Sequence, residues 1–401
     1  MKSLGSTSEQ SRIYNERIIL HLVRRRPGIS RVTIAEETGL STQTISVITS
    51  SLLEHGLLQV SGKVRGKRGQ PSVKLSINAQ GAYGLGMNVD RDHISAVLLD
   101  FSGHCVLSLE RDVPFPTEQV AKDIASELIS EVKARLQDDW VKVKGIGFAK
   151  PDYMDAWLDS LVTDSELRVD LARLQAELTY WQSDAFETWL ASETGLMCYK
   201  ENDAVAAATS ELLFTQGNQV RHFFYLFVSI ACGGSIVADG ECYLGAHGKA
   251  GSFGLIPTLS GKHGRWILEA LSLSSLKRFF AHHLHEYPQS HEAWQAPVVV
   301  GLIDRWSCEV AEEIQPALSA VIALHDPQMI MIGGRLPIVV VDQLICHMTR
   351  LLNQQSVLPV PTISVAQHTA TGVTLGAAVL PLYETFAPQR DVLLLNTQYA
   401  K

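Results

Sequence analysis

Five neighbouring side chains are short hydroxyls or an amide, and they follow directly on the glycine turn Thr38-Gly39-Leu40. They are Ser41, Thr42, Gln43, Thr44 and Ser46. A glutamine amide can pair with N6 and N7 of adenine, and hydroxyls can bond to base edges or phosphate oxygens. The pattern therefore predicts a surface that reads nucleic-acid bases, provided that the start of a helix presents these residues.

Basic residues suited to phosphate contacts lie on both sides of this stretch. Arg31 precedes it, and the glycine-rich segment 61–72 (SGKVRGKRGQPS) follows it. The basic residues of that segment are Lys63, Arg65, Lys67 and Arg68. Lysine and arginine neutralise phosphates, position a protein on the duplex and make its affinity depend on salt. The alternative is a solvated basic face on a small helical domain.

Three helices are expected to present these side chains. Residues 16–26 have one apolar helical face and end at Pro27-Gly28, and Ser30 is placed to cap a short second helix. Ser41 is placed to cap a third helix, whose apolar face is Ile45, Ile48, Leu52 and Leu53 and which stops at Gly56. Two short helices around a tight glycine turn, preceded by a third helix, are typical of a helix-turn-helix.

A β-wing is expected to follow the helices. Residues 57–60 and 73–75 are apolar, strand-like segments that flank the basic segment. Residues 29–58 resemble the winged helix-turn-helix of bacterial repressors along their whole length. In that motif the start of the recognition helix enters the major groove of DNA. We therefore expect residues 1–78 to form a winged helix-turn-helix DNA-binding domain.

The distribution of charge agrees with this expectation. The 401 residues carry a net charge of −8, which taken alone argues against a nucleic-acid binder. Residues 1–75, however, contain 12 Lys and Arg against 5 Asp and Glu, a net charge of +7. The rest of the chain contains 22 basic and 37 acidic residues, a net charge of −15. A small basic head on a large acidic body indicates an anionic partner for the head.

Composition excludes several other classes of protein. Hydrophobic residues make up 46% and charged residues 19%, so a large core can be buried and global disorder is excluded. No run of about 18 apolar residues predicts a transmembrane helix, and the N-terminus lacks the apolar region of a signal peptide. The six cysteines form no C-x-x-C pair, so we expect a reduced cytoplasmic protein without a clustered disulfide framework.

The remainder of the chain predicts an α/β body. Three apolar runs within 82–113 read as an antiparallel meander, followed by a helix at 117–136 and a strand at 143–151. Further on, we expect a helix through Trp189, a strand at 198–200 and a helix that starts near Asp203. The second half repeats the plan, with strands at 222–234 and 235–245, helices in 265–285 and 300–325, and the short strand MIMIGG before another helix.

Four segments of the body resemble the ROK family of repressors and sugar kinases. They are GIGFAKP (145–151), ENDAVAAATSE (201–211), GAHGKAGSFG (245–254) and DPQMIMIGG (326–334). The resemblance implies a duplicated actin/hexokinase-like, or ribonuclease H-like, body of two lobes. It places the lobes at 79–200 and 201–401, with a C-terminal helix that returns towards the first lobe. A winged helix fused to such a body is the arrangement of the family's transcriptional repressors.

The resemblance weakens where the family's kinases bind ATP. Their phosphate turn, G-x-D-x-G-G-T, aligns with residues 86–93 (GMNVDRDH), in which Asn88 replaces the aspartate and the last two glycines and the threonine are absent. Side chains there would crowd the phosphates, and Asp90 and Asp92 would repel them. The second phosphate segment, G-T-G-I-G-G-G, is reduced to SIACGGS at 229–235. We therefore expect no kinase activity and no ATP, although a sugar kinase with a DNA-binding appendage is the alternative.

The resemblance also implies an effector pocket. Asn202 and Asp203 match the family residues that hold sugar hydroxyls, and Glu269 matches a later sugar-binding glutamate. Without ATP these groups could still accept hydrogen bonds from a sugar. The alternative is that Asn202 only caps the following helix.

Three substitutions alter this pocket. Ser252, the fourth predicted effector-binding residue, stands where the family has Glu, and Leu255 stands where it has a histidine that contacts the sugar or binds zinc. Asp152 also replaces the usual glycine after Pro151. The family's zinc-binding C-x-C-G-x-x-G-C segment is replaced by a stretch without cysteine, and His247 and His263 are more typical of surface or turn residues. We therefore expect no metal and no cofactor.

Together these features predict a transcriptional regulator of carbohydrate-related genes, in particular a repressor. The expected partners are an operator in double-stranded DNA, a sugar or sugar derivative as effector, and a second copy of the chain in a homodimer or homotetramer. The acidic body leaves open a repressor that is controlled by a protein partner instead of a sugar.

Overall fold

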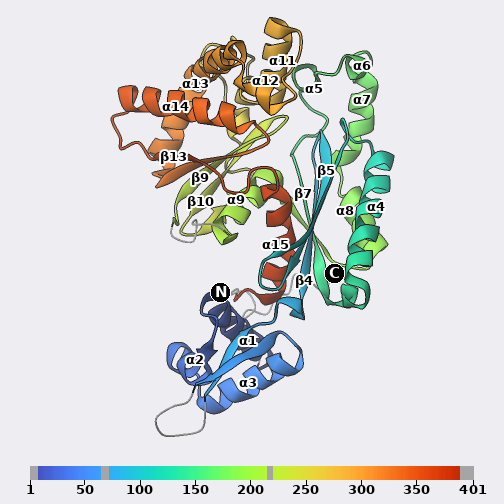
Figure 1. Cartoon of the computed structure of the whole chain (residues 1–401), viewed down its shortest axis with the longest axis vertical. Helices are drawn as coiled ribbons and strands as arrows, with labels where there is room; N and C mark the ends of the chain where they lie inside the picture. The colour runs from blue at the N-terminus through green and yellow to red at the C-terminus, as the bar shows by residue number, and fades with distance from the viewer. Residues whose placement is uncertain (1–7, 65–71, 215–219, 389–401) are drawn as a thin grey trace.

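The computed structural model describes residues 8–64, 72–214 and 220–388 (Figure 1). Its head is a winged helix-turn-helix, as predicted. The elements of the head are α1 (Ser8–Arg25), β1 (Ile29–Ser30), α2 (Arg31–Thr38), α3 (Thr42–Glu54), β2 (Leu58–Val64) and β3 (Ser72–Ile77). The three strands form an antiparallel sheet in the order β1-β3-β2.

Local signals in the sequence account for the helix ends of the head. The Ser30 hydroxyl accepts a hydrogen bond from the backbone N–H of Thr33 at 3.2 Å, and the Ser41 hydroxyl accepts one from Thr44 at 3.1 Å. Both serines therefore act as the predicted N-caps. Gly39 ends α2 with φ of 70°, a left-handed conformation that glycine adopts without strain.

The first helix is longer than the sequence pattern indicated. It begins at Ser8 instead of residue 16, and its added turns are mostly polar. An ion pair at spacing i, i+4 between Arg12 and Glu16, with an N–O distance of 3.0 Å, lies within this part. Such pairs support a polar helix that an apolar periodicity does not reveal.

The first lobe of the body is a five-stranded mixed sheet with helices beside it. Its strands are β4 (Tyr83–Val89), β5 (His93–Asp100), β6 (Cys105–Asp112), β7 (Val143–Lys150) and β8 (Cys198–Asn202). Its helices are α4 (Glu118–Leu136), α5 (Leu158–Leu161), α6 (Ser165–Arg168), α7 (Leu171–Leu178) and α8 (Ala185–Thr194). The strand order is β6-β5-β4-β7-β8, with β4–β5–β6 antiparallel and β7 and β8 parallel to β4. The predicted meander is confirmed.

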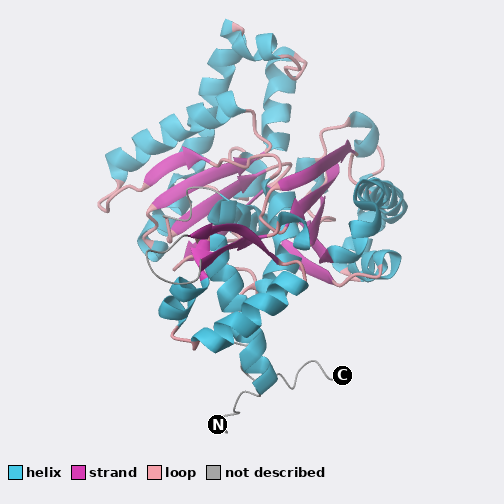
Figure 2. Ribbon diagram, turned by 60° about the horizontal axis from the view of Figure 1, so that its bottom comes forward, coloured by secondary structure: helices cyan, strands magenta, loops and turns pink. Residues whose placement is uncertain are grey.

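The second lobe repeats this topology. Its strands are β9 (Phe223–Val228), β10 (Cys232–Ala238), β11 (Glu241–Tyr243), β12 (Met329–Gly334) and β13 (Thr362–Val365), in the order β11-β10-β9-β12-β13. Its helices are α9 (Asp203–Phe214), α10 (Ile267–Ala270), α11 (Leu273–Leu284), α12 (His291–Gln295), α13 (Pro297–His325), α14 (Ile338–Gln355) and α15 (Gly372–Phe386). Each sheet is an antiparallel meander extended by two parallel strands, so the predicted duplication is confirmed. Figure 2 shows the two sheets side by side with helices around and between them.

Two predicted strands were wrong in their extent. Residues 235–245 were expected to form one strand, but they form the rest of β10, a turn at Asp239–Gly240 and β11. Residues 222–234 were expected to form a single strand, but they form β9, a turn at Ser229–Ala231 and the start of β10. Backbone hydrogen bonding between Ser229 and Ala231 closes this turn although no proline or asparagine marks it. The continuous apolar run conceals a hairpin because both of its strands are buried.

Helix α15 links the parts of the molecule. It packs against β4, β7 and α9 in the body and reaches α1 of the head (Figure 1). At this junction the Arg24 guanidinium lies 4.9 Å from the centre of the Phe101 ring, which in turn packs on Phe386 with 4.5 Å between ring centres. The Arg17 guanidinium donates to the Ala387 carbonyl at 3.1 Å. The head is therefore joined to the body by a shared apolar cluster as well as by the chain.

Within the described ranges, none of the helices combines the length and the hydrophobicity that crossing a membrane requires.

Candidate functional site

The start of α3 presents the predicted base-reading residues. Thr42, Gln43 and Ser46 are exposed. Helix α3, which carries them, belongs to the head at the end of the molecule away from the second lobe (Figure 1). Ser41 and Thr44 are engaged locally, because their hydroxyls lie 2.8 Å apart and the Ser41 hydroxyl caps the helix. Thr42, Gln43 and Ser46 are therefore the side chains of this group best placed to reach base edges.

Sequence reasoning missed two apolar residues on the same part of the head. Val47 lies one turn after Gln43 on α3 and is 63% exposed, and Val32 on α2 is 54% exposed. Apolar side chains at such positions can contact thymine methyl groups in the major groove. The spacing of the buried residues Ile45, Ile48 and Leu52 leaves Val47 off the core face, so the sequence contained the signal for it.

The predicted phosphate contacts are only partly described by the structure. Arg31 is half-buried, and its guanidinium lies 3.4 Å from the Ser50 hydroxyl. Lys63 belongs to strand β2. Arg65, Lys67 and Arg68 lie outside the described residues.

The second candidate site is a cleft between the lobes of the body. It lies where the end of β8, the β4–β5 turn and the β9–β10 turn converge. Of the four predicted effector residues, Asn202, Asp203 and Ser252 line the cleft. Glu269 does not line it. Its carboxylate accepts hydrogen bonds from the Ser160 hydroxyl at 2.8 Å and from the Trp266 backbone N–H at 2.9 Å.

Asn202 and Asp203 stand at the junction of β8 and α9. The Asn202 side-chain oxygen accepts from the backbone N–H groups of Ala204 and Val205 at 3.0 and 3.4 Å, so Asn202 caps α9 while it lines the cleft. Asp203 is buried, and this burial, together with the nearby charge of Asp90, raises the pKa of its carboxyl to about 7. A carboxyl with this pKa can donate or accept a hydrogen bond near neutral pH.

The mouth of the cleft contains residues that the motif comparison did not select. Asp152 on the first lobe and Lys249 on the second form an ion pair with an N–O distance of 2.8 Å. Tyr153 and Trp157 contribute aromatic walls, with their rings edge to face at 5.8 Å. Ser252 is exposed at the rim, and its hydroxyl donates to the Lys249 carbonyl at 2.8 Å. Asp152 was noted in the sequence only as a departure from glycine, because its partner is distant in the chain.

Internal contacts fill the place of the family's phosphate turn. The Asp90 carboxylate accepts a hydrogen bond from the Ser229 hydroxyl at 2.7 Å, which joins the two lobes. The buried Arg91 guanidinium donates to the Tyr153 carbonyl at 2.9 Å. Burial lowers the pKa of Arg91, and the nearby carboxylates of Asp90 and Asp203 act in the opposite direction.

A second set of ionic contacts crosses the lobes beside this turn. Arg335, directly after β12, lies within 4.0 Å of carboxylate oxygens of Asp92, Glu110 and Asp112. Although burial favours the neutral form, the hydrogen bond from His93 and the charges of His93 and Arg335 lower the pKa of Asp92. These contacts hold the β4–β5 turn and the end of β6 of the first lobe against the second lobe.

Two places are candidates for a metal ion, the cluster of Asp90, Asp92 and His93 and the segment that corresponds to the family's zinc site, and the residues present suit neither of them. Oxygen and nitrogen atoms of Asp90, Asp92 and His93 lie within 4.8 Å of one another, but Ser229 and Arg335 already contact the carboxylates. The family's zinc segment corresponds to residues 256–266, which contain no cysteine. His263 in this segment lies 3.0 Å from Glu309, and His247 is exposed. A tetrahedral site with thiolate ligands cannot be assembled from this segment.

Comparison with known proteins gives agreement over most of the chain. Residues 84–383 match the profile of the ROK family. The Sinorhizobium fredii protein y4fQ, described as uncharacterized, is 25% identical over 389 residues, which cover 93% of this chain and 91% of that protein. The xylose repressor of Bacillus spizizenii is 24% identical over 270 residues, which cover 66% of this chain and 67% of the repressor.

A solved structure matches head and body together. It is a ROK family transcriptional regulator described as a homologue of the E. coli MLC protein. The two structures share 20% sequence identity with a TM-score of 0.68, and the match covers 94% of this chain and 98% of that one. At this identity the likeness concerns the fold alone.

Proposed function

Since the chain belongs to the ROK family, we propose that it is a DNA-binding transcriptional repressor of carbohydrate-related genes. The observation that carries the proposal is the head, in which the start of α3 is exposed and capped at the end of the molecule away from the second lobe. The similarity to a xylose repressor supports a link to sugars. The chain acts as a homodimer or homotetramer in this proposal, because paired half-sites raise the affinity for an operator.

The effector in this proposal is a sugar or sugar derivative in the interlobe cleft. Buried Asp203 and half-buried Asn202 can bond hydroxyl groups, and the Tyr153 and Trp157 rings can cover an apolar sugar face. Asp152 and Lys249 lie on opposite lobes, so a ligand that separates or tightens this pair changes the angle between the lobes. Helix α15 contacts elements of both lobes and also α1 of the head. In this proposal it transmits the change in the angle between the lobes to the head.

The body acts without ATP in this proposal, and no metal or other cofactor is needed. By the family resemblance, Asp90 and Asp92 stand where phosphates would bind, and a carboxylate repels phosphate most strongly where it is buried, as Asp90 is. One observation favours the alternative of a sugar kinase: a carboxyl with a pKa of about 7, as at Asp203, suits a general base. ATP consumption over a sugar panel tests this alternative, and turnover that Asp203→Asn abolishes would overturn the non-enzymatic assignment.

DNA binding is tested first with the full chain. Genomic fragments selected by the protein should yield a specific operator whose affinity falls steeply with salt. The double variant Thr42→Ala/Gln43→Ala should lose this specificity, whereas Thr188→Ala, an exposed threonine on α8, should not. Failure to select any fragment above random DNA would contradict the assignment.

The sensor role is tested with the operator in hand. We expect one neutral or modified sugar to change operator affinity and Asp203→Asn to remove the response. Asp304→Asn is the matched control, because Asp304 is an exposed aspartate that pairs with His347 outside the cleft. An unchanged operator affinity with every sugar, combined with no sugar binding by calorimetry, would contradict the sensor role and leave DNA binding intact.

A further inference from the structure

A second cavity lies at the end of the body away from the head, between α11, α13 and the loop that precedes α10 (Figure 1). It shares no lining residue with the interlobe cleft. Six of its nine lining side chains are basic or imidazole groups, and one is acidic. We name it the basic pocket and define it by Lys262, His263, Ser275, Arg278, Phe279, His282, His283, Arg305 and Glu309.

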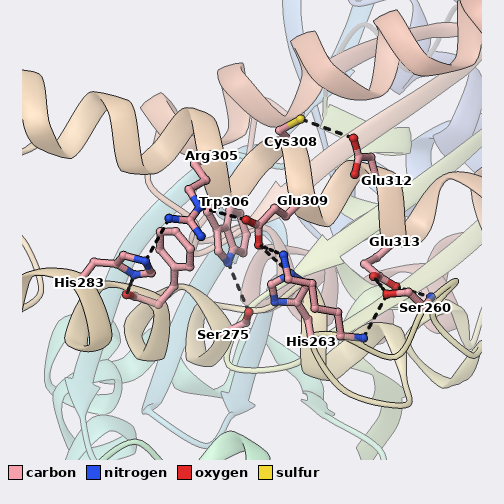
Figure 3. Close-up of polar contacts among 12 residues, drawn as sticks. Ser260, His263, Ser275, His283, Arg305, Trp306, Cys308, Glu309, Glu312 and Glu313 are labelled. Carbon is pink, nitrogen blue, oxygen red and sulfur yellow. Dashed lines mark hydrogen bonds and ion pairs between the residues drawn. The ribbon is translucent and has the colours of Figure 1, made fainter.

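The basic pocket has more positive than negative charge. Its one carboxylate, Glu309, is shared by Lys262 at 2.9 Å, Arg305 at 3.0 Å and His263 at 3.0 Å (Figure 3). Burial opposes the ionisation of Glu309, but hydrogen bonds from Lys262 and Arg305 lower its pKa, so it is a fixed negative charge. Lys262, Arg278 and Arg305 together exceed it by two charges even with every imidazole neutral.

Arg278 has capacity for another acceptor. One of its terminal nitrogens, Nη2, donates to the Glu269 carbonyl at 3.1 Å, whereas the buried Nη1 has no hydrogen-bond partner among the described residues. Burial lowers the pKa of Arg278, and the nearby charge of Arg168 adds to this effect. A buried guanidinium N–H without an acceptor is costly, and an anion would relieve that cost.

Aromatic packing holds the basic pocket in shape. The His283 ring stacks on Phe279 with 4.3 Å between ring centres, and its Nδ1 lies 2.8 Å from the Phe279 carbonyl. The Arg305 guanidinium lies 5.9 Å from the centre of the Phe279 ring and 3.4 Å from His283. Beneath them, buried Trp306 donates to the Ser275 hydroxyl at 3.3 Å (Figure 3). The cationic groups are therefore held in place by side chains packed between α11 and α13.

The position of the basic pocket argues against a role in contacting the operator. Helices α11 and α13 lie at the end of the molecule opposite α1–α3 (Figure 1). The body has a net charge of −15, so a concentration of positive charge on it is a local feature and does not extend the basic surface of the head. The basic pocket opens to solvent at Lys262 and Arg305, and its nine lining residues can surround one phosphate together with a small organic group.

We propose that the basic pocket binds the phosphate group of a small phosphorylated metabolite, at a site separate from the interlobe cleft. Arg278 supplies its unpartnered Nη1, and Arg305 and Lys262 supply positive charge, a combination that suits phosphate.

Calorimetry on the full chain tests the proposal, with inorganic phosphate and glucose 6-phosphate as probes and glucose and sodium chloride as controls. We expect phosphate and glucose 6-phosphate to bind, with an affinity that falls between 50 and 200 mM salt. Arg305→Gln and Lys262→Gln should each weaken binding about tenfold, since charge-assisted hydrogen bonds are the strong ones. Both side chains are more than half exposed, so neither change should impair folding.

Arg173→Gln is the matched control. Arg173 makes the same contact as Arg305, from Nε to a glutamate four residues later, but on α7 of the other lobe. The Arg173→Gln variant should bind phosphate with the same affinity as the wild type. Equal binding by the wild type, Arg305→Gln and Lys262→Gln would overturn the proposal, because it would place the phosphate elsewhere, for example on the basic head. An equal loss in Arg173→Gln would overturn it as well, because the effect would then reflect net charge alone.

Discussion

Gln43 combines exposure with the hydrogen-bonding groups that read a base pair. A bidentate contact from a glutamine to adenine discriminates against other bases by about 1–3 kcal/mol. We therefore expect Gln43→Ala to weaken operator binding by this amount and to leave binding to random DNA unchanged. Competition gel shifts with operator and random duplexes measure both affinities.

The control for Gln43 is Gln80→Ala, an exposed glutamine at the junction between head and body. It should alter neither affinity. A uniform loss of affinity for operator and random DNA in Gln43→Ala would mean that Gln43 contacts phosphate and not a base.

Asp203 makes the stability of the protein depend on pH. Burial raises the pKa of its carboxyl to about 7, whereas an unfolded aspartate titrates near ~4. Between these values the folded state binds more protons than the unfolded state, so this group lowers stability as the pH rises. We expect Asp203→Asn to be increasingly more stable than the wild type from pH 4 to pH 7.

Urea unfolding of the two proteins across this range measures the difference. The two profiles should diverge through the window and run parallel above it, because the folded carboxyl is then fully ionised. Parallel profiles over the whole range would show that Asp203 titrates at its ordinary pKa.

Among the elements, α15 depends on a close approach to α9. A Cβ atom on Gly376 would lie 1.7 Å from the Ala206 carbonyl oxygen, so this contact requires glycine. Gly376→Ala should force the two helices apart and cost about 1–3 kcal/mol of unfolding free energy. Because α9 begins at Asp203, the displacement should also weaken the response of operator binding to the effector. Thermal unfolding and operator titration with the effector measure the two effects.

Gly301→Ala is the control for Gly376→Ala, because it introduces the same methyl group into a helix at a position with free space. Gly301 lies in α13, and a Cβ added there meets nothing within 4 Å. This substitution should stabilise the protein by about 0.5–1 kcal/mol, since alanine favours the helix over glycine. A similar loss of stability in both variants would exclude the α9–α15 contact as the cause.

The pairing of the two lobes depends on Arg335. Its guanidinium contacts three carboxylates of the first lobe. Without Arg335 these three carboxylates would lie near one another with no positive charge between them. Arg335→Gln should therefore destabilise the protein by about 1–3 kcal/mol, as expected when charged groups lose their hydrogen-bonding partner. Urea unfolding measures this cost. An unchanged midpoint would mean that solvent screens these carboxylates.

At the scale of the whole molecule, head and body share one apolar cluster around Phe101. Its side chain is fully buried between Arg24 of the head and Phe386 of the body. Phe101→Ala should cost about 3–5 kcal/mol, typical of a large aromatic removed from a core. It should also split unfolding into separate transitions of head and body, visible by calorimetry. Val357→Ala, at a fully exposed site, should change neither. A single transition in Phe101→Ala would mean that other contacts couple the two parts.

Much of the architecture could be predicted because its signals are local. Ser30 and Ser41 cap the helices that follow them, and the three apolar runs of 82–113 form the meander, because caps and periodicity act between near neighbours. The division of charge likewise follows from composition alone. The predicted domain boundaries and site residues remain predictions to be tested by the variants above.

Contacts between distant segments could be decided only by the tertiary structure. Sequence motifs grouped Glu269 with Asn202 and Asp203, but packing turns Glu269 to Ser160 and brings Lys249 to Asp152 instead. The hairpin at Ser229–Ala231 and the basic pocket around Glu309 were also absent from the sequence pattern. The sequence determined which segments become helices or strands and where charge is concentrated. The tertiary structure decided which side chains meet, because burial and ion pairing depend on distances that chain order does not encode.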